Sequence, residues 1–422
     1  MKNKTYDCIV IGGGAAGMTA AITAAREHAS VLLLEHTQRL GSKILSTGNG
    51  KCNFTNLNMG KEMYQNQDQQ FVETVINEFG VTETLDFFQN IGIFHKQKNG
   101  YVYPHSETAA SLQDALRMEV EHLKVAVRTE CKIESVEVKS QSGSTSYQVK
   151  TDQGVFCGLT VILCTGSKAA PRTGSDGSGY TIAKHLGHRI RKPLPALVQL
   201  TSPDKICKAM AGVRSTGNVQ LYLDGSCVSS DLGEIQYTDY GISGIPVFQI
   251  SRFAVSGVDR KQKAHVMIDM LPDYSEDQLE QDVRRRYTYD GSKTVEQFFS
   301  GLLNKKLVQG ICKRLGISCN EEVKNMSMKD ILHICNNMKE FMLKIDGSKT
   351  FDQAQVCQGG VELKEIDPQT MQSRIQAGFF FAGEVVDVDG KCGGYNLQWA
   401  WSSAVVAGRS AAGFAKERNI IC

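Results

Sequence analysis

A glycine-rich turn near the start of the chain constrains the fold more than any other feature. Residues 12–17 read GGGAAG and match the pattern G-x-G-x-x-G. The apolar run 7–11 precedes this turn, an Ala-rich stretch over 18–27 follows it, and a second apolar run, 31–34, ends at Glu35. A buried strand, a tight turn, a helix and a second buried strand form the βαβ unit that binds dinucleotides in Rossmann-like folds.

Each part of this turn has a mechanical reason. Gly12 permits the sharp bend, Gly14 lets the backbone approach a pyrophosphate, and Gly17 lets the helix pack closely against the strand. The helix then opens at Ala15 and Ala16, whose N–H groups have no partner within the helix and are available to phosphates.

The acidic residue after the second strand narrows the choice of nucleotide. Glu35 stands twenty-three residues after Gly12, where a carboxylate accepts hydrogen bonds from ribose hydroxyls and disfavours a 2′-phosphate. FAD or NAD is therefore expected rather than NADP. The chain has no second complete G-x-G-x-x-G, and its last part returns to the chemistry of the first. This organisation is typical of an FAD-binding fold.

Helices and a meander are expected before residue 160. Apolar residues recur at helical spacing over 68–90, with a break at Gly80, and again over 111–123. Residues alternate between apolar and polar over 131–138 and 147–150, which predicts a small antiparallel meander.

The later part of the chain changes character twice. A buried strand is expected over 160–164, and the stretch from about 196 to 270 is strand-like. From about 275 to 340 the chain is helical and more charged. A buried strand is then expected over 378–382, followed by a final helix through Ala407.

These segments predict an α/β fold in which a Rossmann-like FAD-binding domain of the glutathione-reductase type carries an inserted β-barrel-like and helical region. The FAD-binding domain is expected to be discontinuous, over 1–193 and 352–422. A β-barrel-like substrate domain is expected over 194–272 and 341–351, and a helical cap over 273–340, with the substrate between cap and flavin.

Charge and composition exclude several classes of protein. Lys and Arg number 47 against 45 Asp and Glu, and this net charge of +2 argues against electrostatically driven binding of nucleic acid. No apolar run approaches the roughly 20 residues that a membrane-spanning helix needs. The thirteen Cys include no C-x-x-C pair and the nine His no metal-ligand spacing. We therefore expect buried thiols in a reducing cytoplasm and no metal site.

The segment 39–56, RLGSKILSTGNGKCNFTN, is too polar and glycine-rich for a core. Its backbone N–H groups and Lys43 or Lys51 are candidates to face phosphates or a flavin ring, where positive charge near N1 and O2 stabilises the reduced anion. Two alternatives stand beside this interpretation. The segment is a plain surface loop, or Cys52 is a thiol whose pKa is lowered by Lys51.

Together with VIGGGAAGM, this segment resembles the BaiN/YhiN-like flavoproteins, also described as aminoacetone-oxidase-like or NAD(P)/FAD-dependent oxidoreductases. The family more often has Arg at the positions of Ser42 and Lys51; Ser42 removes a charge, and Lys51 keeps the charge without the planar fork of Arg. Further blocks match the family in order and cover residues 100–116, 163–180, 240–251 and 359–408.

The resemblance implies a non-covalent FAD site assembled from both ends of the chain. Acids after the strand 378–382 would bind the ribityl chain or pyrophosphate, and the start of the final helix would address the pyrimidine edge of the flavin. Thr165 and Gly166 would bring a strand back beneath the cofactor, and Ile133 would contact adenine. The expected cofactor-binding residues are Gly12, Gly14, Ala15, Ala16, Gly17, Glu35, His36, Lys43, Ser46, Gly48, Gly50, Lys51, Cys52, Asn53, Ile133, Thr165, Gly166, Gly383, Glu384, Asp387, Asn396 and Leu397.

The resemblance also implies a reaction. The best-defined activity in the family is reduction of 3-oxo-Δ4 and Δ6 bile-acid intermediates, so we expect a small apolar or enone substrate and NADH or NADPH as electron donor. Hydride from flavin N5 goes to the β carbon, and a side chain near the carbonyl supplies the proton for the α carbon. The candidates for this proton donor lie in polar-aromatic turns and are Tyr103, His105, Tyr240 and Tyr395.

Two other functions fit the same sequence. One is an amine or aminoketone oxidase that passes electrons to oxygen. The other is a flavin-bound regulatory or interaction protein without catalysis. The sequence sets no oligomeric state.

Overall fold

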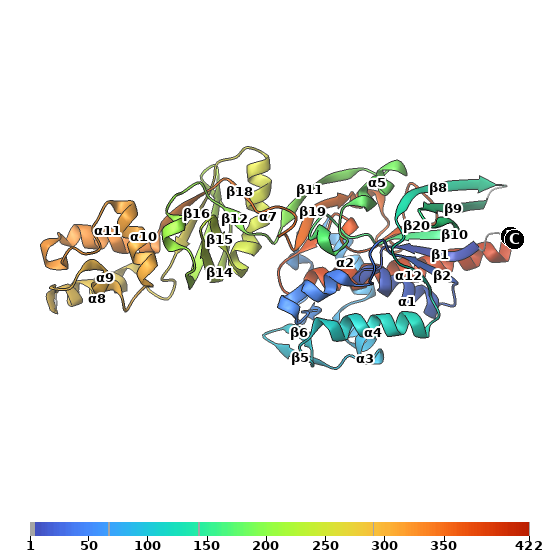
Figure 1. Ribbon diagram of the computed structural model, residues 1–422, viewed down its shortest axis with the longest axis horizontal. Coiled ribbons are helices and arrows are strands. Elements are labelled where there is room, and N and C mark those ends of the chain that lie inside the picture. Colours follow the sequence, from blue (N-terminus) through green and yellow to red (C-terminus); the bar gives the residue numbers. More distant parts are fainter. Residues whose placement is uncertain (1–4, 66–67, 142–143, 290, 422) are drawn as a thin grey trace. The chain divides into compact units, whose positions relative to one another are not determined.

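The computed structural model describes residues 5–65, 68–141, 144–289 and 291–421. The chain clusters into two compact units (Figure 1). The first unit holds Met1–Pro193 and Val356–Cys422, and the second holds Leu194–Gln355. The finer division expected for the insertion, into a substrate domain and a helical cap, remains a proposal.

A seven-stranded sheet forms the centre of the first unit. The strands β7, β2, β1, β10 and β20 run parallel, and β9 and β8 extend the sheet as the antiparallel meander that the alternating pattern predicts. This parallel, Rossmann-type arrangement confirms the predicted fold class. Across the sheet the order is β7 (Ala126–Arg128), β2 (Val31–Leu34), β1 (Thr5–Ile11), β10 (Gly154–Leu163), β9 (Ser144–Thr151) and β8 (Ile133–Gln141), with β20 (Phe379–Phe381) beside β10.

Helices from opposite ends of the chain cover this sheet side by side (Figure 1). α1 (Ala15–Arg26) packs against α12 (Tyr395–Ile421), and α4 (Ala109–His122) packs against α1. The contact between α1 and α12 is close because Gly408 has no side chain, and a Cβ there would lie 2.7 Å from the carbonyl oxygen of Ala20. The final helix runs to Ile421, beyond its predicted end at Ala407. Its close contact with α1 places it in the same core as the glycine turn.

Two short helices follow the pattern predicted for 68–90. α2 (Gln69–Glu78) begins at Asp68, whose carboxylate accepts from the first N–H groups, and α3 (Val81–Asn90) begins at Gly80. The smaller elements of the first unit are β3 (Thr55–Asn56), β4 (Tyr64–Gln65), β5 (His95–Lys98), β6 (Tyr101–Pro104), α5 (Ser178–His185), β19 (Val356–Val361) and β21 (Asp389–Gly390); β11 (Ile190–Ala196) pairs with β19.

An antiparallel sheet forms the centre of the second unit, and the helices expected over 275–340 follow it. The strand order is β17 (Phe341–Ile345), β16 (Ala264–Asp269), β13 (Arg214–Leu223), β14 (Ser226–Thr238), β15 (Gly241–Ser243), β12 (Leu200–Thr201) and β18 (Gly347–Ser348). The helices are α6 (Cys207–Met210), α7 (Ile245–Asp259), α8 (Glu276–Tyr289), α9 (Val295–Phe299), α10 (Lys305–Leu315) and α11 (Met328–Lys339). Within the described ranges, no helix combines the length and the apolar character that a membrane span requires.

The helix α7 corrects the prediction that 196–270 is strand-like throughout. Pro246 lies in its first turn, where a missing N–H costs nothing, and Gly244 before it has a φ of 108°. The buried residues on α7 recur at the spacing of one helical face, and this face packs on β14. The prediction overlooked this signal, although the 15 residues of α7 exceed the length of a typical strand and its buried positions have the helical period.

A buried hydrogen-bonded chain joins the segment before β11 to the one before β20. His188 lies 3.1 Å from Glu365 through Nδ1 and 2.9 Å from Ser373 Oγ through Nε2. Ser373 Oγ accepts from two backbone N–H groups, so its own proton is left to donate to Nε2. Nδ1–H then donates to the carboxylate, and the network is complete with a neutral imidazole. Burial lowers the pKa of His188 below 6.5, although the Glu365 carboxylate opposes this shift.

Acidification should therefore weaken the fold. The unfolded chain binds a proton at this imidazole near pH 6.5 and the folded chain resists it, so the free energy of unfolding is expected to fall as the pH drops below that value. Urea unfolding at about pH 7.5 and about pH 5.5 measures the loss. His188→Gln keeps a hydrogen-bonding side chain that does not titrate, so its loss should be smaller. An equal loss in both proteins would contradict the assignment.

Candidate functional site

The turn between β1 and α1 has room for a ligand at one glycine only. Gly12 has a φ of 102°, and a Cβ there would lie 2.6 Å from the Cys164 carbonyl oxygen. A Cβ on Gly17 would lie 1.7 Å from the carbonyl oxygen of Gly12. Gly14, in contrast, has extended backbone and no atom within 4 Å of its Cβ position. Protein atoms therefore pack against the turn at Gly12 and Gly17, and the turn is open to a ligand at Gly14.

Glu35 closes the second strand and holds the turn in place. Its carboxylate, which is 7% exposed, accepts from the N–H of Gly13 at 2.6 Å and from the N–H of Thr37 at 2.7 Å. The imidazole of His36 lies 3.5 Å from the same carboxylate. The N–H of Cys131 donates to the Glu35 carbonyl, which brings the segment that leads into Ile133 beside this end of the sheet.

The ends of β10 and β20 carry a second charged group. Glu384 lies in a 3-10 turn, Gly383–Val385, and accepts from Lys43 Nζ at 2.7 Å and from Ser167 Oγ at 3.2 Å. Gly383 packs against α1, since a Cβ there would lie 2.8 Å from the Cβ of Ala16. The ion pair thus joins the segment after β2 to the turn after β20, at the carboxyl edge of the sheet where ligands of such folds bind.

Three observations show that these residues fit FAD. α1 begins at Gly14 without a side-chain cap, so its first N–H groups are available to phosphates. The space beside Gly14 is open. The hydroxyl oxygen of Thr165, next to Gly166, is buried without a hydrogen-bond partner among the described residues.

Residues of the expected cofactor loop differ in whether they lie near the other expected site residues. It forms 3-10 turns over Ser42–Gly50, in which Gly48 and Gly50 have φ of 55° and 84°. Ser46 is exposed and donates to the Lys43 carbonyl. Lys51 is also exposed and lies 3.5 Å from Glu107, so of the two lysines the structure brings Lys43 to the other expected site residues.

Two neighbouring residues in this loop are buried. The amide oxygen of Asn53 accepts from the N–H of Val102 at 3.2 Å and so fixes the loop to β6. Cys52 is fully buried, and burial raises the pKa of its thiol to about 11. The alternative of a thiol with lowered pKa beside Lys51 is therefore wrong. The positive charge of that lysine faces solvent and Glu107.

Two polar residues of the C-terminal block already have protein partners. Asp387 is buried, lies 3.2 Å from Arg191 and accepts from the N–H of Gly359 at 2.9 Å. The amide of Asn396 bonds both the N–H and the carbonyl of Gly390. Leu397 packs on the core. Glu384, in contrast, pairs with a side chain from the N-terminal half of the candidate site, that of Lys43.

The four proton-donor candidates are not equivalent. Tyr395 is buried, and its hydroxyl donates to the Asn58 carbonyl at 3.2 Å. Tyr240 belongs to the second unit, where Lys349 Nζ lies 3.7 Å from its ring centroid. Tyr103 is half-buried on β6, and burial, Tyr101 and Cys392 raise its pKa.

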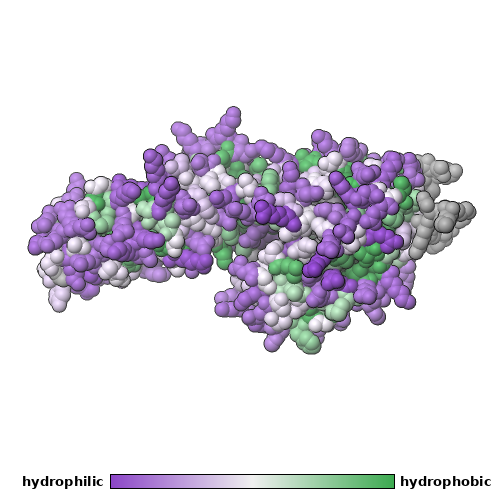
Figure 2. Space-filling view, in the orientation of Figure 1, coloured by the Kyte–Doolittle hydropathy of each residue, from purple (hydrophilic) through white to green (hydrophobic). Residues whose placement is uncertain are grey.

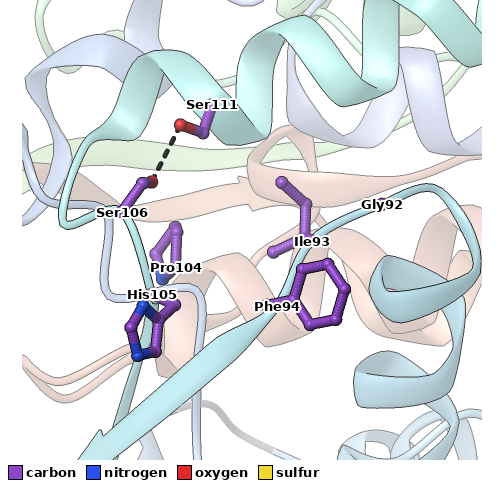
Figure 3. Close-up of a pocket in the computed structure, with 7 residues that line it drawn as sticks. All are labelled: Gly92, Ile93, Phe94, Pro104, His105, Ser106 and Ser111. Atoms are coloured by element: carbon purple, nitrogen blue, oxygen red, sulfur yellow. Dashed lines mark hydrogen bonds between the residues drawn. The ribbon is translucent and has the colours of Figure 1, made fainter.

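His105 lines a separate cavity of about 480 Å³ (Figure 3). The cavity lies between the first turn of α4 and the loop before β5, and Ser106 and Ser111 are 2.8 Å apart on its wall. Pro104 also lines it, and side chains alternate along a strand, so the cavity is on the face of β6 opposite to Tyr103. Figure 2 shows a mostly hydrophilic surface with scattered apolar patches. Phe94, which also lines the cavity, is 74% exposed.

Sequence reasoning missed three side chains that the structure brings to the site. Ser167 bonds Glu384, Arg191 bonds Asp387, and Tyr180 is buried on α5. Ser167 directly follows Thr165 and Gly166, and Tyr180 ends the block 163–180, so both stood within segments already identified. Their roles depend on contacts between distant segments, which spacing alone does not contain.

A pair of glycine variants tests the open side of the turn. Gly14→Ala should leave the free energy of unfolding of the cofactor-free protein nearly unchanged, because the new methyl group meets nothing. It should weaken FAD binding by more than tenfold, because the methyl group occupies the space through which phosphates approach. Gly17→Ala should destabilise the protein itself, because its methyl group collides with the Gly12 carbonyl. Urea unfolding and flavin titration measure both effects, and unchanged FAD affinity in Gly14→Ala would contradict the assignment.

Known proteins of similar sequence extend over nearly the whole chain. The chain is 40% identical over 408 residues to a Clostridium scindens protein named 3-dehydro-bile acid delta(4,6)-reductase, which covers 96% of this chain and 98% of that protein. It is 28% identical over 399 residues to a Haemophilus influenzae protein named ribosomal RNA dihydrouridine synthase, with 94% and 96% covered. A protein of the same name from Escherichia coli is 29% identical over 406 residues, with 95% and 96% covered.

A solved structure agrees with the fold. The 3-ketosteroid delta1-dehydrogenase from Sterolibacterium denitrificans superposes with a TM-score of 0.51 at 12% identity and covers 97% of this chain and 99% of its own. The model of the HI0933-like protein Rossmann domain matches residues 6–410. These matches confirm the family that the sequence motifs indicated: the chain belongs to the HI0933-like proteins with a Rossmann domain.

Proposed function

We propose that this protein is an FAD-dependent oxidoreductase that reduces a C=C bond conjugated to a carbonyl group, with a 3-oxo-Δ4 or Δ6 steroid or bile acid as substrate and NADH or NADPH as electron donor. The observation that carries the proposal is the 40% identity, over nearly all of both chains, to a protein named as a bile-acid reductase. The open turn at Gly14 and the buried polar groups at the carboxyl edge of the sheet support the cofactor part of the proposal.

The names of the other relatives support the reaction class independently of the substrate. Dihydrouridine is uridine with its 5,6 double bond saturated, and that bond is conjugated to the C4 carbonyl. A 3-oxo-Δ4 steroid presents the same group, a C=C bond beside a C=O bond. Relatives named for a sterol-like acid and for ribosomal RNA therefore share one kind of electrophile.

Bound FAD would supply the hydride. The residues of this chain would then have three tasks. The first turn of α1 would hold the pyrophosphate and Glu35 the ribose. Lys43 would place a positive charge near the flavin end of FAD. Its ion pair with Glu384, at 2.7 Å, would hold its side chain there and away from solvent. A proton donor would protonate the substrate carbon beside the carbonyl.

We favour Tyr103 as this donor. Side chains at i and i+2 share one face of a strand, so Tyr101 and Tyr103 lie together on β6. A Cβ on Gly393, just before α12, would lie 3.0 Å from the Tyr101 ring, which brings this face to the helix expected at the flavin. Burial raises the pKa of Tyr103, so the hydroxyl keeps its proton until a carbanion-like centre needs it. Tyr395 is less suited because its proton is already donated to a carbonyl.

Reduction of RNA is the second candidate, and two full-length relatives favour it. Charge does not favour it, because the chain carries a net charge of +2. The region 273–340 holds eleven Lys or Arg against eleven Asp or Glu, and binding to a phosphate backbone draws on an excess of positive charge. We therefore place the small enone substrate first.

Anaerobic stopped-flow with the purified yellow protein tests the reaction class. NADH or NADPH should bleach the flavin band, and a 3-oxo-Δ4 steroid added afterwards should restore it, with loss of the enone absorbance. Reoxidation by undermodified ribosomal RNA, and not by enones, would favour the second candidate. Bleaching by an amine without NADH or NADPH would indicate the oxidase, and a flavin that no donor reduces would indicate a protein without catalysis.

Tyr103→Phe tests the proton donor. Reduction of the enone should slow by roughly 100- to 10,000-fold, the usual contribution of general acid catalysis, while the bound flavin content stays the same. Reduction of the flavin by NADH or NADPH should be unchanged, because no proton from this residue is needed there. Tyr395→Phe is the matched control, since it removes a neighbouring hydroxyl that is bonded within the protein. Equal rates of enone reduction in the two variants would contradict the role of Tyr103.

A further inference from the structure

Three hydroxyl groups in the first unit are buried without any hydrogen-bond partner among the described residues. One belongs to Thr19, within α1. The other two belong to Thr165, after the end of β10, and to Tyr180, on α5, and the inference concerns these two hydroxyls. Tyr180 is 7% exposed. A buried hydroxyl without a partner has lost its water and gained nothing in return, so such groups are rare unless a water or a ligand completes them.

These two hydroxyls lie at the two ends of one loop. The loop 165–177 leaves β10 and returns at α5, where a Cβ on Gly179 would lie 1.8 Å from Thr165 Oγ1. Gly179 directly precedes Tyr180. Residues at both ends of the loop are therefore neighbours, although thirteen residues of the sequence lie between Thr165 and Gly179.

The same loop reaches both charged ends of the candidate site. Gly174 packs on the residues after Glu35, since a Cβ there would lie 2.9 Å from Thr37 and 3.4 Å from His36. At the other end, Ser167 donates to Glu384 at 3.2 Å. The loop is therefore held near Glu35 by Gly174 and near Glu384 by Ser167. It runs along the carboxyl edge of the sheet, where dinucleotides bind in such folds.

Tyr180 lies toward Glu384 rather than toward Glu35 along this edge of the sheet. α5 packs against β19, and β19 packs against the turn that holds Glu384. Burial, and then the charges of Cys357, Glu384 and Asp387, raise the pKa of Tyr180, which agrees with a position beside these groups. Glu384 bonds Lys43 and Ser167, and Asp387 bonds Arg191 and Gly359. Among the described residues neither carboxylate accepts a hydrogen bond from the Tyr180 hydroxyl.

We propose that the hydroxyls of Tyr180 and Thr165 are hydrogen-bonding groups for the flavin half of FAD, and that the cofactor supplies the partners they lack. The inference rests on the proposed function, because it requires that the site binds FAD. It adds to that proposal a contact residue, Tyr180, and a direction, since Glu384 marks the flavin half and Glu35 the adenosine half.

The alternative is that Tyr180 only fills space. The two interpretations predict different effects of Tyr180→Phe on FAD binding. Removal of an unsatisfied hydroxyl should leave the cofactor-free protein as stable as the wild type or more stable, because no bond is lost. If the hydroxyl binds flavin, the same change should weaken FAD binding by about 2- to 10-fold, the effect of one hydrogen bond.

The experiment uses cofactor-stripped full-length protein and measures binding of FAD and of ADP by titration calorimetry, with urea unfolding of each stripped variant. Tyr180→Phe and Thr165→Val should each weaken FAD binding and leave ADP binding unchanged, because ADP fills only the adenosine half. Glu35→Ala should weaken both ligands. Tyr147→Phe is the matched control: Tyr147 is also buried, but its hydroxyl donates to the Ala377 carbonyl at 2.8 Å. It should destabilise the stripped protein and leave FAD affinity unchanged.

Each outcome separates the inference from the proposed function. A wild-type protein that binds neither FAD nor ADP would overturn both. A wild type that binds FAD, with Tyr180→Phe of equal affinity, would overturn the inference and leave the proposed function standing. Equal losses for FAD and ADP in Tyr180→Phe would also overturn it, because the hydroxyl would then act on the whole site. A shift of the bound-flavin absorption bands in Tyr180→Phe, absent in Tyr147→Phe, is a further expected result.

Discussion

The first unit depends on the contact between the backbone at Gly12 and the first turn of α1 at Gly17. Their separation leaves no space for a Cβ, so strand and helix meet backbone to backbone. This contact fixes the direction of α1, and with it the direction in which its free N–H groups point. It also brings the end of β1 next to the end of β10, where the Cys164 carbonyl closes over Gly12. Neighbouring protein atoms occupy the Cβ positions of Gly12, Gly13 and Gly17, and only the Cβ position of Gly14 in this turn is open. This open space is where a ligand can approach the sheet edge.

The same edge is completed from the far end of the sequence. Gly383 reaches Ala16, and Glu384 then meets Lys43 across 341 positions of the chain. Trp399 and Trp401 fasten α12 to these segments by donating to the carbonyls of Gly383 and Phe54. The glycine motif alone therefore does not form the candidate site. Its second carboxylate, Glu384, arrives with the turn after β20, near the other end of the sequence.

The sequence predicted best what depends on neighbouring residues. The unit from β1 to β2, the break at Gly80 and the antiparallel meander all follow from local pattern, and the structure has them at nearly the predicted bounds. α7 was missed although its 15 residues and the spacing of its buried positions favour a helix. Within the candidate site, spacing predicted Glu35 and the family resemblance predicted Glu384, but neither could show that Lys51 turns away to Glu107. Tyr180 needed the fold, because nothing in a tyrosine after Ser-Gly indicates an unpartnered hydroxyl.

The discontinuity of the first unit has a consequence for biosynthesis. When the ribosome has translated as far as residue 355, the glycine turn and the long parallel strands have emerged, but β20, Glu384 and α12 have not. Such a nascent chain lacks α12, the partner of α1, and it lacks Glu384, so it exposes the apolar face that α12 later covers. Cofactor capture therefore belongs to the end of translation. Loss of the last helix by premature termination would produce a colourless and aggregation-prone fragment rather than a weakened enzyme.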